Sequence, residues 1–303
     1  MTAENYSLSV LRQLEAESIH ILREVAAEFE RPVVMHSVGK DSSVLLKLAQ
    51  KAFAPCPIPI PLLHIDTGDK FPEMYAFRDR VCAALGVDLR VLGNAAAIAA
   101  GTNHWDLGAD NCCGLLESKA LLDALKAGGY DAVISGARRD EERSRAKGHI
   151  YSIRDRDGQW DPRNQRPELW SLYNGRIDAG ESIRVFPLSN WTELDTWRYI
   201  AMEDIEVVPL YFAAERDVVR RGGQLLPVGT NTRLLPGETP TRAVIRSRSL
   251  GCYPVTSAVE SNARTVTDII AELEGTRFSK RLTHVIDLDR DGSMEQNKRE
   301  GYF

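Results

Sequence analysis

The sequence has few cysteines, no long hydrophobic run and no excess of positive charge. Its five cysteines are scattered through 303 residues without a Cys-x-x-Cys pair, and a chain of this length can bury a core without disulfide bonds. No apolar stretch approaches the roughly 18 residues of a membrane-spanning helix. Residues 1–6 lack a cationic start followed by an apolar run, so we expect no signal peptide. These absences predict a reduced, cytoplasmic protein without a membrane partner.

The charge balance argues against a protein that coats nucleic acid. Lysine and arginine number 38, and aspartate and glutamate number 43, which gives a net charge of −5. Surfaces that bind nucleic acid are usually basic, so we expect no nucleic-acid partner. Any anion must then be bound by positive charge that is gathered locally.

Short apolar runs alternate with helical patterns in the first half of the chain. An amphipathic helix over the first thirty residues ends at Arg31-Pro32, since proline disfavours helical geometry in the residue before it. The strands expected next cover 33–36, 62–65, 87–92 and 132–134, and the helices between them cover 42–53, 74–85 and 115–125. This alternation predicts an α/β fold with a doubly wound, mostly parallel sheet, which binds ligands at the carboxyl ends of its strands.

The second half of the chain differs in composition and in hydrophobic pattern. Residues 138–176 are rich in Arg, Asp, Gly and Pro, and Thr192–Asp195 has the pattern of a helix N-terminus. From about residue 213 the pattern is mixed. We therefore predict a catalytic domain over 1–212 and a smaller C-terminal region over 213–303, which contacts a partner and the active site.

The segment 37–43, Ser-Val-Gly-Lys-Asp-Ser-Ser, lies between the first predicted strand and its helix. Gly39 permits close approach of a ligand, the helix offers unpaired N–H groups, and Lys40 and the serine hydroxyls add donors. It is neither a Walker loop nor a dinucleotide-binding fingerprint. We predict that it binds phosphates; the alternative is a serine-rich turn with an ordinary cap. The predicted ATP and pyrophosphate site comprises Ser37, Val38, Gly39, Lys40, Asp41, Ser42, Ser43, Asp66 and Gly136.

Arginines follow the last predicted strand of this half. Arg138, Arg139, Arg143 and Arg145 lie just beyond Gly136, and the planar guanidinium suits tetrahedral oxyanions. The alternative is a solvated charged face, because acidic residues 140–142 interrupt the run.

Residues 37–42 resemble the Ser-x-Gly-Lys-Asp-Ser signature of the PP-loop ATP pyrophosphatases, α/β enzymes that cleave ATP between the α- and β-phosphates. Other segments narrow the resemblance to the small, catalytic subunits of bacterial ATP sulfurylases, the sulfate adenylyltransferases. These segments are 64–68, 136–142, 144–147, 164–170, 186–193, 292–295 and 298–303. The resemblance implies a PP-loop fold of the adenine nucleotide α-hydrolase type.

The resemblance also implies a reaction, in which ATP and sulfate give adenosine 5′-phosphosulfate and pyrophosphate. Direct displacement needs positioning and concentrated positive charge rather than a nucleophilic side chain. We expect Lys40, Arg138 and Arg139 to be catalytic, and Arg138, Arg139, Arg143 and Arg145 to bind sulfate. The family further implies a GTPase large subunit as partner, because the reaction is strongly uphill and this chain has no Walker loop.

The metal prediction concerns carboxylates. Asp66 at a strand end, or Asp41, would help to hold Mg²⁺, which prefers one or two carboxylates plus phosphates. Asp66 is equally explained as a strand-terminal cap. His36 and His64 lie in predicted strands and are expected to be core residues rather than ligands.

Two departures from the family keep other interpretations open. Asp69 and Pro72 stand where the family usually has Trp and Arg, and 111–119 contains a Cys-Cys pair like that of the related adenylylsulfate reductases. Those reductases bind an iron–sulfur cluster with a later Cys-x-x-Cys, whereas Cys252 has no second partner, so we expect no cluster. The alternatives are a paralogue that adenylylates another oxyanion, a reductase, and a PP-loop protein that acts on tRNA.

Overall fold

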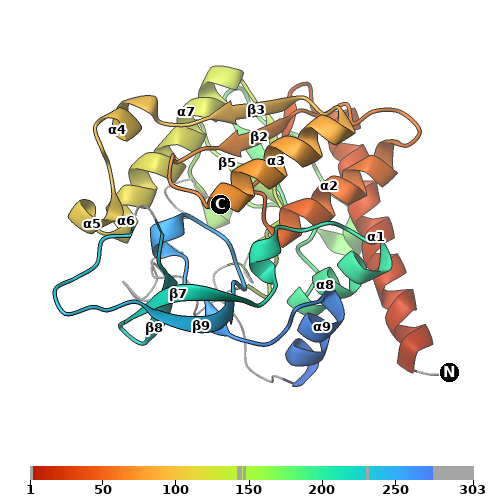
Figure 1. The fold of residues 1–303 in the computed structure, drawn as a ribbon. Helices are drawn as coiled ribbons and strands as arrows, with labels where there is room; N and C mark the ends of the chain where they lie inside the picture. The colour runs from red at the N-terminus through yellow and green to blue at the C-terminus, as the bar shows by residue number, and fades with distance from the viewer. Residues whose placement is uncertain (1–2, 142–144, 146–147, 230–231, 276–303) are drawn as a thin grey trace.

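The computed structural model describes residues 3–141, 145, 148–229 and 232–275. In this part of the chain, a six-stranded sheet with the order β3-β2-β1-β4-β6-β5 forms the larger unit (Figure 1). Every neighbouring pair is parallel except β5 and β6, which are antiparallel. The strands are β1 (Pro32–Met35), β2 (Leu62–Ile65), β3 (Leu89–Leu92), β4 (Ala132–Ile134), β5 (Tyr151–Arg154) and β6 (Ser182–Val185).

Helices cover both faces of this sheet, as the alternating pattern predicts. On one face Val33, Leu63 and Val133 pack against α7 (Lys119–Gly128). The other face forms the main core with the longer helices, and Trp197 is completely buried there. Those helices are α1 (Ala3–Glu28), α2 (Lys40–Phe53), α3 (Pro72–Leu85) and α8 (Glu193–Met202).

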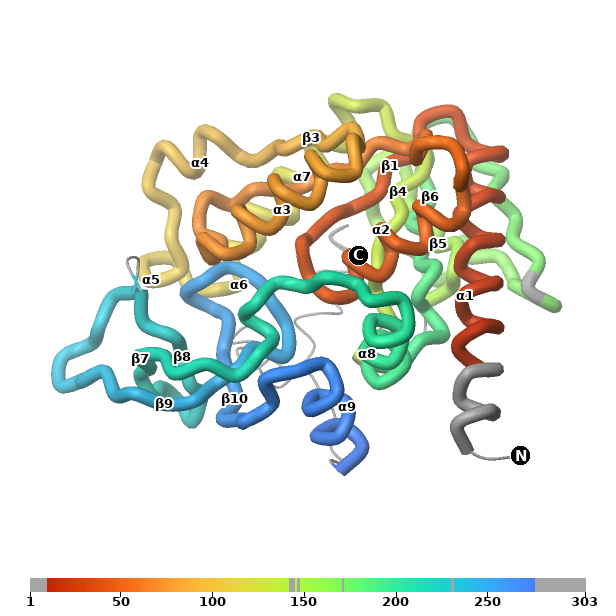
Figure 2. The backbone as a smooth tube through the Cα atoms, turned by 45° about the vertical axis from the view of Figure 1, so that its right-hand side comes forward, coloured from red at the N-terminus to blue at the C-terminus, as the bar shows by residue number. Residues whose placement is uncertain are grey.

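A second, antiparallel sheet in the order β10-β9-β7-β8 follows α8 in the chain. Its strands are β7 (Ala214–Arg221), β8 (Gln224–Pro227), β9 (Thr241–Arg246) and β10 (Val259–Glu260). Figures 1 and 2 both show this sheet on the side where the short helices α5 (His104–Leu107) and α6 (Ala109–Cys113) lie. Arg233 pairs with Asp106 there at 2.8 Å, while α9 (Val266–Gly275) packs against α8.

Most predicted elements of the first half are confirmed, with shifted ends. The helix expected at 42–53 begins at Lys40, because Gly39 is its N-cap residue. The helix expected at 115–125 is a π-helical turn, η1 (Gly114–Ser118), followed by α7, and α4 (Ala95–Ala99) precedes it. Thr192 and Asp195 form the expected capping box of α8. No helix in the described ranges is both long and apolar enough to cross a membrane.

Candidate active site

A cavity of about 230 Å³ opens at the carboxyl ends of β1 and β4, where the fold predicts a ligand. The loop between β1 and α2 forms one wall, and the segment after β4 forms another. Residues from the second half of the chain close it. The lining residues that carry the chemistry are Ser37, Gly39, Lys40, Asp41, Ser42, Gly136, Arg138, Asp140, Glu141, Arg145, Arg184, Glu193, Tyr211 and Arg248. The cavity thus contains much of the predicted ATP site.

The loop has a constrained backbone. Val38 has a φ of 67°, which is unusual for a β-branched residue, and Gly39 takes an ordinary extended conformation. The Gly39 carbonyl accepts the Ser42 hydroxyl at 2.8 Å and the Ser43 hydroxyl at 3.2 Å. Ser37 remains exposed. The hydroxyls of Ser42 and Ser43 therefore hold the start of α2 in place, while Ser37 is accessible.

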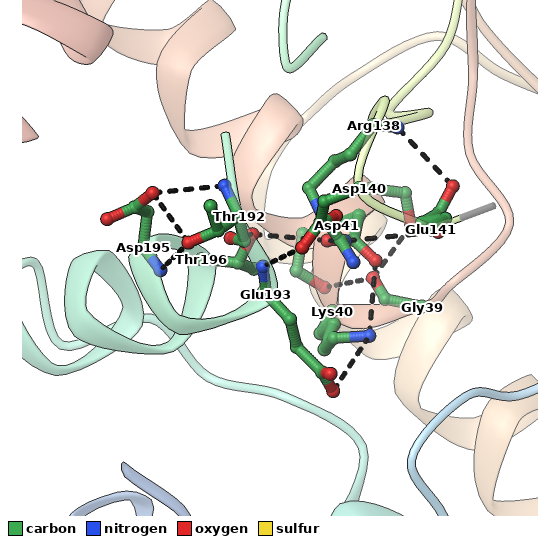
Figure 3. Close-up of polar contacts among 12 residues, drawn as sticks. Gly39, Lys40, Asp41, Arg138, Asp140, Glu141, Thr192, Glu193, Asp195 and Thr196 are labelled. Carbon is green, nitrogen blue, oxygen red and sulfur yellow. Dashed lines mark hydrogen bonds and ion pairs between the residues drawn. The ribbon is translucent and has the colours of Figure 1, made fainter. Parts of the chain in front are cut away.

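Lys40 is buried and is fixed by segments far away in the sequence. Its backbone N–H donates to the Tyr211 hydroxyl at 2.8 Å. Its ammonium donates to the Arg248 carbonyl at 3.2 Å and lies 4.0 Å from Glu193 (Figure 3). Arg248 pairs in turn with Glu193 at 2.6 Å. The positive charge of Lys40 is thus positioned from both sides of the cavity.

Asp41 and Arg138 form a buried ion pair between the loop and the segment after β4. Burial alone would raise the pKa of Asp41, but the charges of Arg138 and Lys40 lower it to about 2. Burial likewise opposes the charge of Arg138, and Asp41 and Asp140 outweigh it and raise the pKa of the guanidinium. Arg138 Nε is 3.0 Å from Asp140. Both partners are therefore fully charged at neutral pH.

The structure divides the predicted arginine cluster. Arg138 and Arg145 line the cavity, and Arg145 pairs with Glu141. Arg139 points instead to the Gly148 carbonyl and to Asn190. Arg143 lies outside the described residues, as do Glu142, Ser144, Lys147 and the predicted family segments of the C-terminal tail. Arg138 and Arg145 both pair with carboxylates. The net positive charge at this wall of the cavity is therefore smaller than the run of arginines in the sequence suggests.

Gly136 lies close to the backbone of Asp41. A Cβ atom there would lie 3.1 Å from the carbonyl carbon of Asp41 and 3.2 Å from its oxygen. At Gly39 a Cβ atom would meet only ordinary contacts, the nearest being the Tyr211 hydroxyl at 3.4 Å. Packing within the protein therefore favours glycine at 136, whereas at 39 the space would admit a Cβ atom.

Sequence reasoning missed cavity residues that come from β6 and from the segments after it. These are Arg184, Glu193, Tyr211 and Arg248. Only Glu193 had a signal, because it follows the capping residue Thr192 in a segment shared with the family. The N-terminus of α8 is joined to the site: the Glu193 N–H donates to Asp140 at 2.9 Å. The Thr196 hydroxyl donates to Asp41 at 3.3 Å.

Asp66 does not fit the role of a magnesium ligand. Its Oδ1 accepts the Gly68 N–H and the Tyr75 hydroxyl, each at 2.8 Å, so it caps the turn after β2. It is not among the described residues that line the cavity. Asp41 lines the cavity, but its carboxylate is engaged by Arg138, Lys40 and Thr196. We therefore do not assign these two carboxylates as metal ligands in the reaction.

The cysteines that resemble those of the reductases lie together, outside the cavity lining of the described residues. Cys113 and Cys252 both pack against Ala109 and Val255. Burial raises the pKa of Cys252 to about 12, and burial also raises that of Cys113. These thiols are protonated at neutral pH, which disfavours a nucleophilic role. Within the described ranges, no group of three or more His, Cys, Asp or Glu side chains could hold a metal ion.

Fold and site together define an α/β protein of the adenine nucleotide α-hydrolase-like class, with a polar cavity at the carboxyl edge of its parallel strands. The family model of the phosphoadenosine phosphosulfate reductase domain matches residues 31–258. Sulfate adenylyltransferase subunit 2 of Myxococcus xanthus is 58% identical over 296 residues, which are 97% of each chain. That of Methylococcus capsulatus is 56% identical over 299 residues, 98% of this chain and 99% of the relative.

A crystal structure of phosphoadenylyl-sulfate reductase from Candida auris, in a phosphate complex, is similar with a TM-score of 0.47 and 19% identity. The similar region covers 69% of this chain and 91% of the reductase chain. The chain belongs to the phosphoadenosine phosphosulfate reductase domain family and, within it, to the sulfate adenylyltransferase subunit 2 family. The resemblance found in the motifs is thereby confirmed, together with the predicted fold and class of enzyme.

Proposed function

We propose that the chain transfers the adenylyl group of ATP to sulfate in the cavity above β1 and β4. The observation that carries this proposal is the joined arrangement of loop 37–43, Lys40 and Arg138 at the carboxyl edge of the sheet. The loop and the N-terminus of α2 would bind the β- and γ-phosphates. Loss of pyrophosphate release after truncating Arg138, with ATP still bound, tests the assignment.

The chemistry follows from charge rather than from a nucleophilic side chain. A sulfate oxygen attacks the α-phosphorus, its new P–O bond forms, and the bond between the α-phosphorus and the bridging oxygen breaks as pyrophosphate leaves. Negative charge is redistributed over the α-phosphate and the leaving group. Lys40 and Arg138 are fixed beside the loop before the substrate arrives, so they stabilise that charge without reorganisation. Arg145, which lines the cavity, is the proposed sulfate contact of the same segment, whereas Arg139 is directed to Gly148 and Asn190.

The first prediction concerns Arg138 and separates adenylyl transfer from reduction. Changing Arg138 to Ala removes a buried charge-assisted contact and leaves Asp41 without its partner. We expect turnover to fall about 30- to 1,000-fold, with a smaller change in ATP affinity, and Lys to restore only part of the loss. The measurement is sulfate-dependent pyrophosphate release beside ATP binding.

Controls come from the exposed Arg163 and from the cysteines. Arg163→Ala, Cys113→Ser and Cys252→Ser should leave turnover within about threefold of the parent. Inactive cysteine variants beside an active Arg138→Ala variant would establish the reductase interpretation instead.

Sulfate is favoured as the acceptor because the sequence departures lie away from the cavity. Neither Asp69 nor Pro72, nor any residue of 111–119, is among the described lining residues. The Asp69 carbonyl accepts the Tyr253 N–H at 2.7 Å, which gives this position a structural contact. Pyrophosphate release with molybdate or phosphate in place of sulfate tests the alternative of another oxyanion.

The second subunit is proposed to be a GTPase. The relatives are subunits by name, and this sequence contains no Walker loop through which it could bind GTP itself. The C-terminal region is the proposed contact surface. If the purified chain alone reaches the rate of the complex, and GTP has no effect on either, coupling by a GTPase is wrong. Mg²⁺ is proposed to enter with the ATP phosphates, and its omission from the assay tests that role.

A further inference from the structure

The face of the sheet below the cavity contains an arginine whose burial is unexplained by its contacts. Arg154, on β5, has no exposed surface. Its Nη1 donates to the Ser152 hydroxyl at 3.1 Å. Its Nε and Nη2 atoms are buried without a hydrogen-bond partner among the described residues. An isolated buried guanidinium is strongly disfavoured, so this side chain indicates a ligand that the protein itself does not supply.

Arg184 places a second positive charge beside the first. The Cα atoms of Ser152 and Arg184 are register partners across β5 and β6, so their side chains share one face of the sheet. Arg184 is also the partner of Val133, which packs against α7. Burial lowers the pKa of Arg184 to about 10, while burial and the charge of Arg184 lower that of Arg154. An anion beside Arg154 would relieve the cost of burying its guanidinium group.

The direction of Arg154 leads to the cavity. Because β5 runs antiparallel to β6, a side chain that turns from position 154 toward Ser152 points to the carboxyl edge of the parallel strands. Arg184 lines the cavity at that edge, on the same face as Val133 and Leu121. Arg184 therefore lies in the cavity lining, and the Arg154 side chain is directed toward the same edge of the sheet.

The charges elsewhere in the cavity favour the acceptor rather than ATP as the ligand of this pair. Arg138 and Arg145 are matched by carboxylates, and Lys40 by Asp41 and Glu193. The loop already offers the donors that a polyphosphate needs. We infer that Arg154 and Arg184 form the subsite for the acceptor, a tetrahedral dianionic oxyanion. Arg184 would contact it directly, and Arg154 would contact it or position Arg184. This inference rests on the proposed function.

The test uses Arg154→Met, which keeps a long side chain and removes the charge, and Arg154→Lys. Arg156→Met is the matched control, since Arg156 is exposed two residues further along. In the complex with the partner subunit, pyrophosphate release is measured against sulfate at saturating ATP, and against ATP at saturating sulfate. Arg154→Met should raise the KM for sulfate about tenfold or more and the KM for ATP less than about twofold, with partial rescue by Lys.

A binding measurement on the purified chain separates this inference from the proposed function. Sulfate should raise the midpoint of thermal unfolding of the parent above the midpoint measured in sodium chloride of equal ionic strength. This stabilisation should be lost in Arg154→Met and Arg184→Met. Without anion, Arg154→Met should unfold no earlier than the parent, because a buried unpaired charge is removed.

An unchanged sulfate KM and an unchanged sulfate stabilisation in both variants would overturn the inference. A rise in the KM for ATP equal to that for sulfate would overturn its assignment to the acceptor. If the parent releases no pyrophosphate with sulfate, the proposed function fails, and the stabilisation by sulfate alone still decides whether an anion binds here.

Discussion

Each cation beside the loop of α2 is held by a group from another segment of the chain. Arg138 lies between Asp41 and Asp140, and the Lys40 ammonium reaches the Arg248 carbonyl. Side chains fixed in this way are oriented before a substrate binds, so less reorganisation is needed in the transition state. A change in any of these partners is therefore expected to affect turnover more than folding.

Gly136→Ala tests the close backbone approach between the two walls of the cavity. The added Cβ would press on the Asp41 backbone at 3.1 Å and displace the start of α2 by a few tenths of an ångström. We expect kcat/KM for ATP to fall about tenfold or more, because small displacements of positioned groups have large effects on rate. Steady-state pyrophosphate release measures this change.

Gly114→Ala is the control for that variant. Gly114 has helical φ and ψ angles, and a Cβ there meets nothing within 4 Å. It should retain the activity of the parent and a similar free energy of unfolding. Equal activity of the two variants would show that the contact between Gly136 and Asp41 does not position the loop.

A pair of buried histidines should make stability depend on pH. The His64 ring lies 2.8 Å from the His36 carbonyl, and burial lowers the pKa of each imidazole to about 4. In the unfolded chain these groups bind protons near pH 6.5, so between pH 6.5 and 4 the unfolded state holds more protons than the folded state. Stability is therefore full above pH 6.5 and is lost as the pH falls.

From pH 6.5 to 5, each histidine should lower the free energy of unfolding by about 1.5 kcal/mol. Denaturant unfolding at several pH values measures the slope, and His64→Asn should flatten it by about a third, because burial also lowers the pKa of His104 to about 4. A slope that is the same in parent and variant would mean that other groups cause the pH dependence.

The candidate site could be predicted from sequence only where its residues are local. Loop 37–43 forms one short motif, and Gly136 and Arg138 follow a recognisable strand, so each carried a signal. Tyr211 and Arg248 had none, because only folding brings them to Lys40. The positive charge of the arginines after β4 was overestimated for the same reason, because the sequence does not show which arginines form ion pairs with carboxylates.

At the scale of elements, alternation located strands β1 to β4 of the larger sheet and the helices between them, but it did not locate β6. Strand β5 was missed, because it is an antiparallel addition from the Arg- and Gly-rich segment after β4. The second sheet was also missed, since its strands carry charges along the exposed face, as in β7. Short-range periodicity reports burial on one face and says little about pairing between distant segments.

Thr192→Ala tests whether the N-terminus of α8 serves the site as well as the helix. Thr192 and Asp195 form a capping box, so its loss should lower the free energy of unfolding by about 1 kcal/mol. Because Glu193 and Thr196 contact Asp140 and Asp41, fraying of this end should also lower kcat/KM, by about fivefold.

The control is Thr265→Ala, which removes the hydroxyl that accepts the Asp268 N–H at the start of α9. It should cause a similar loss of stability with unchanged kcat/KM. Equal activity losses in the two variants would mean that the effect comes from stability alone, and chemical unfolding beside kinetics distinguishes the two.

At the scale of the whole molecule, the second half of the chain completes a site that begins in the first. Tyr211 lies in η5 (Pro209–Tyr211), between α8 and the second sheet. Its ring packs edge-on against Trp197 at 5.5 Å, and the neighbouring Leu210 carbonyl accepts the Ser247 N–H at 2.9 Å. A partner bound to the C-terminal region could therefore act on the loop through this connection.

Tyr211→Phe tests that connection, since it removes one oxygen and keeps the packed ring. The Lys40 N–H would lose its 2.8 Å partner inside the protein, which should lower the free energy of unfolding by about 1–3 kcal/mol. The start of α2 would no longer be anchored, so we expect kcat/KM for ATP to fall about tenfold. Tyr130→Phe is the matched control, because the Tyr130 hydroxyl accepts Arg90 at 2.7 Å far from the cavity. It should lose stability without losing activity. If Tyr211→Phe and Tyr130→Phe have the same kcat/KM, the hydroxyl of Tyr211 stabilises the fold and does not position the loop.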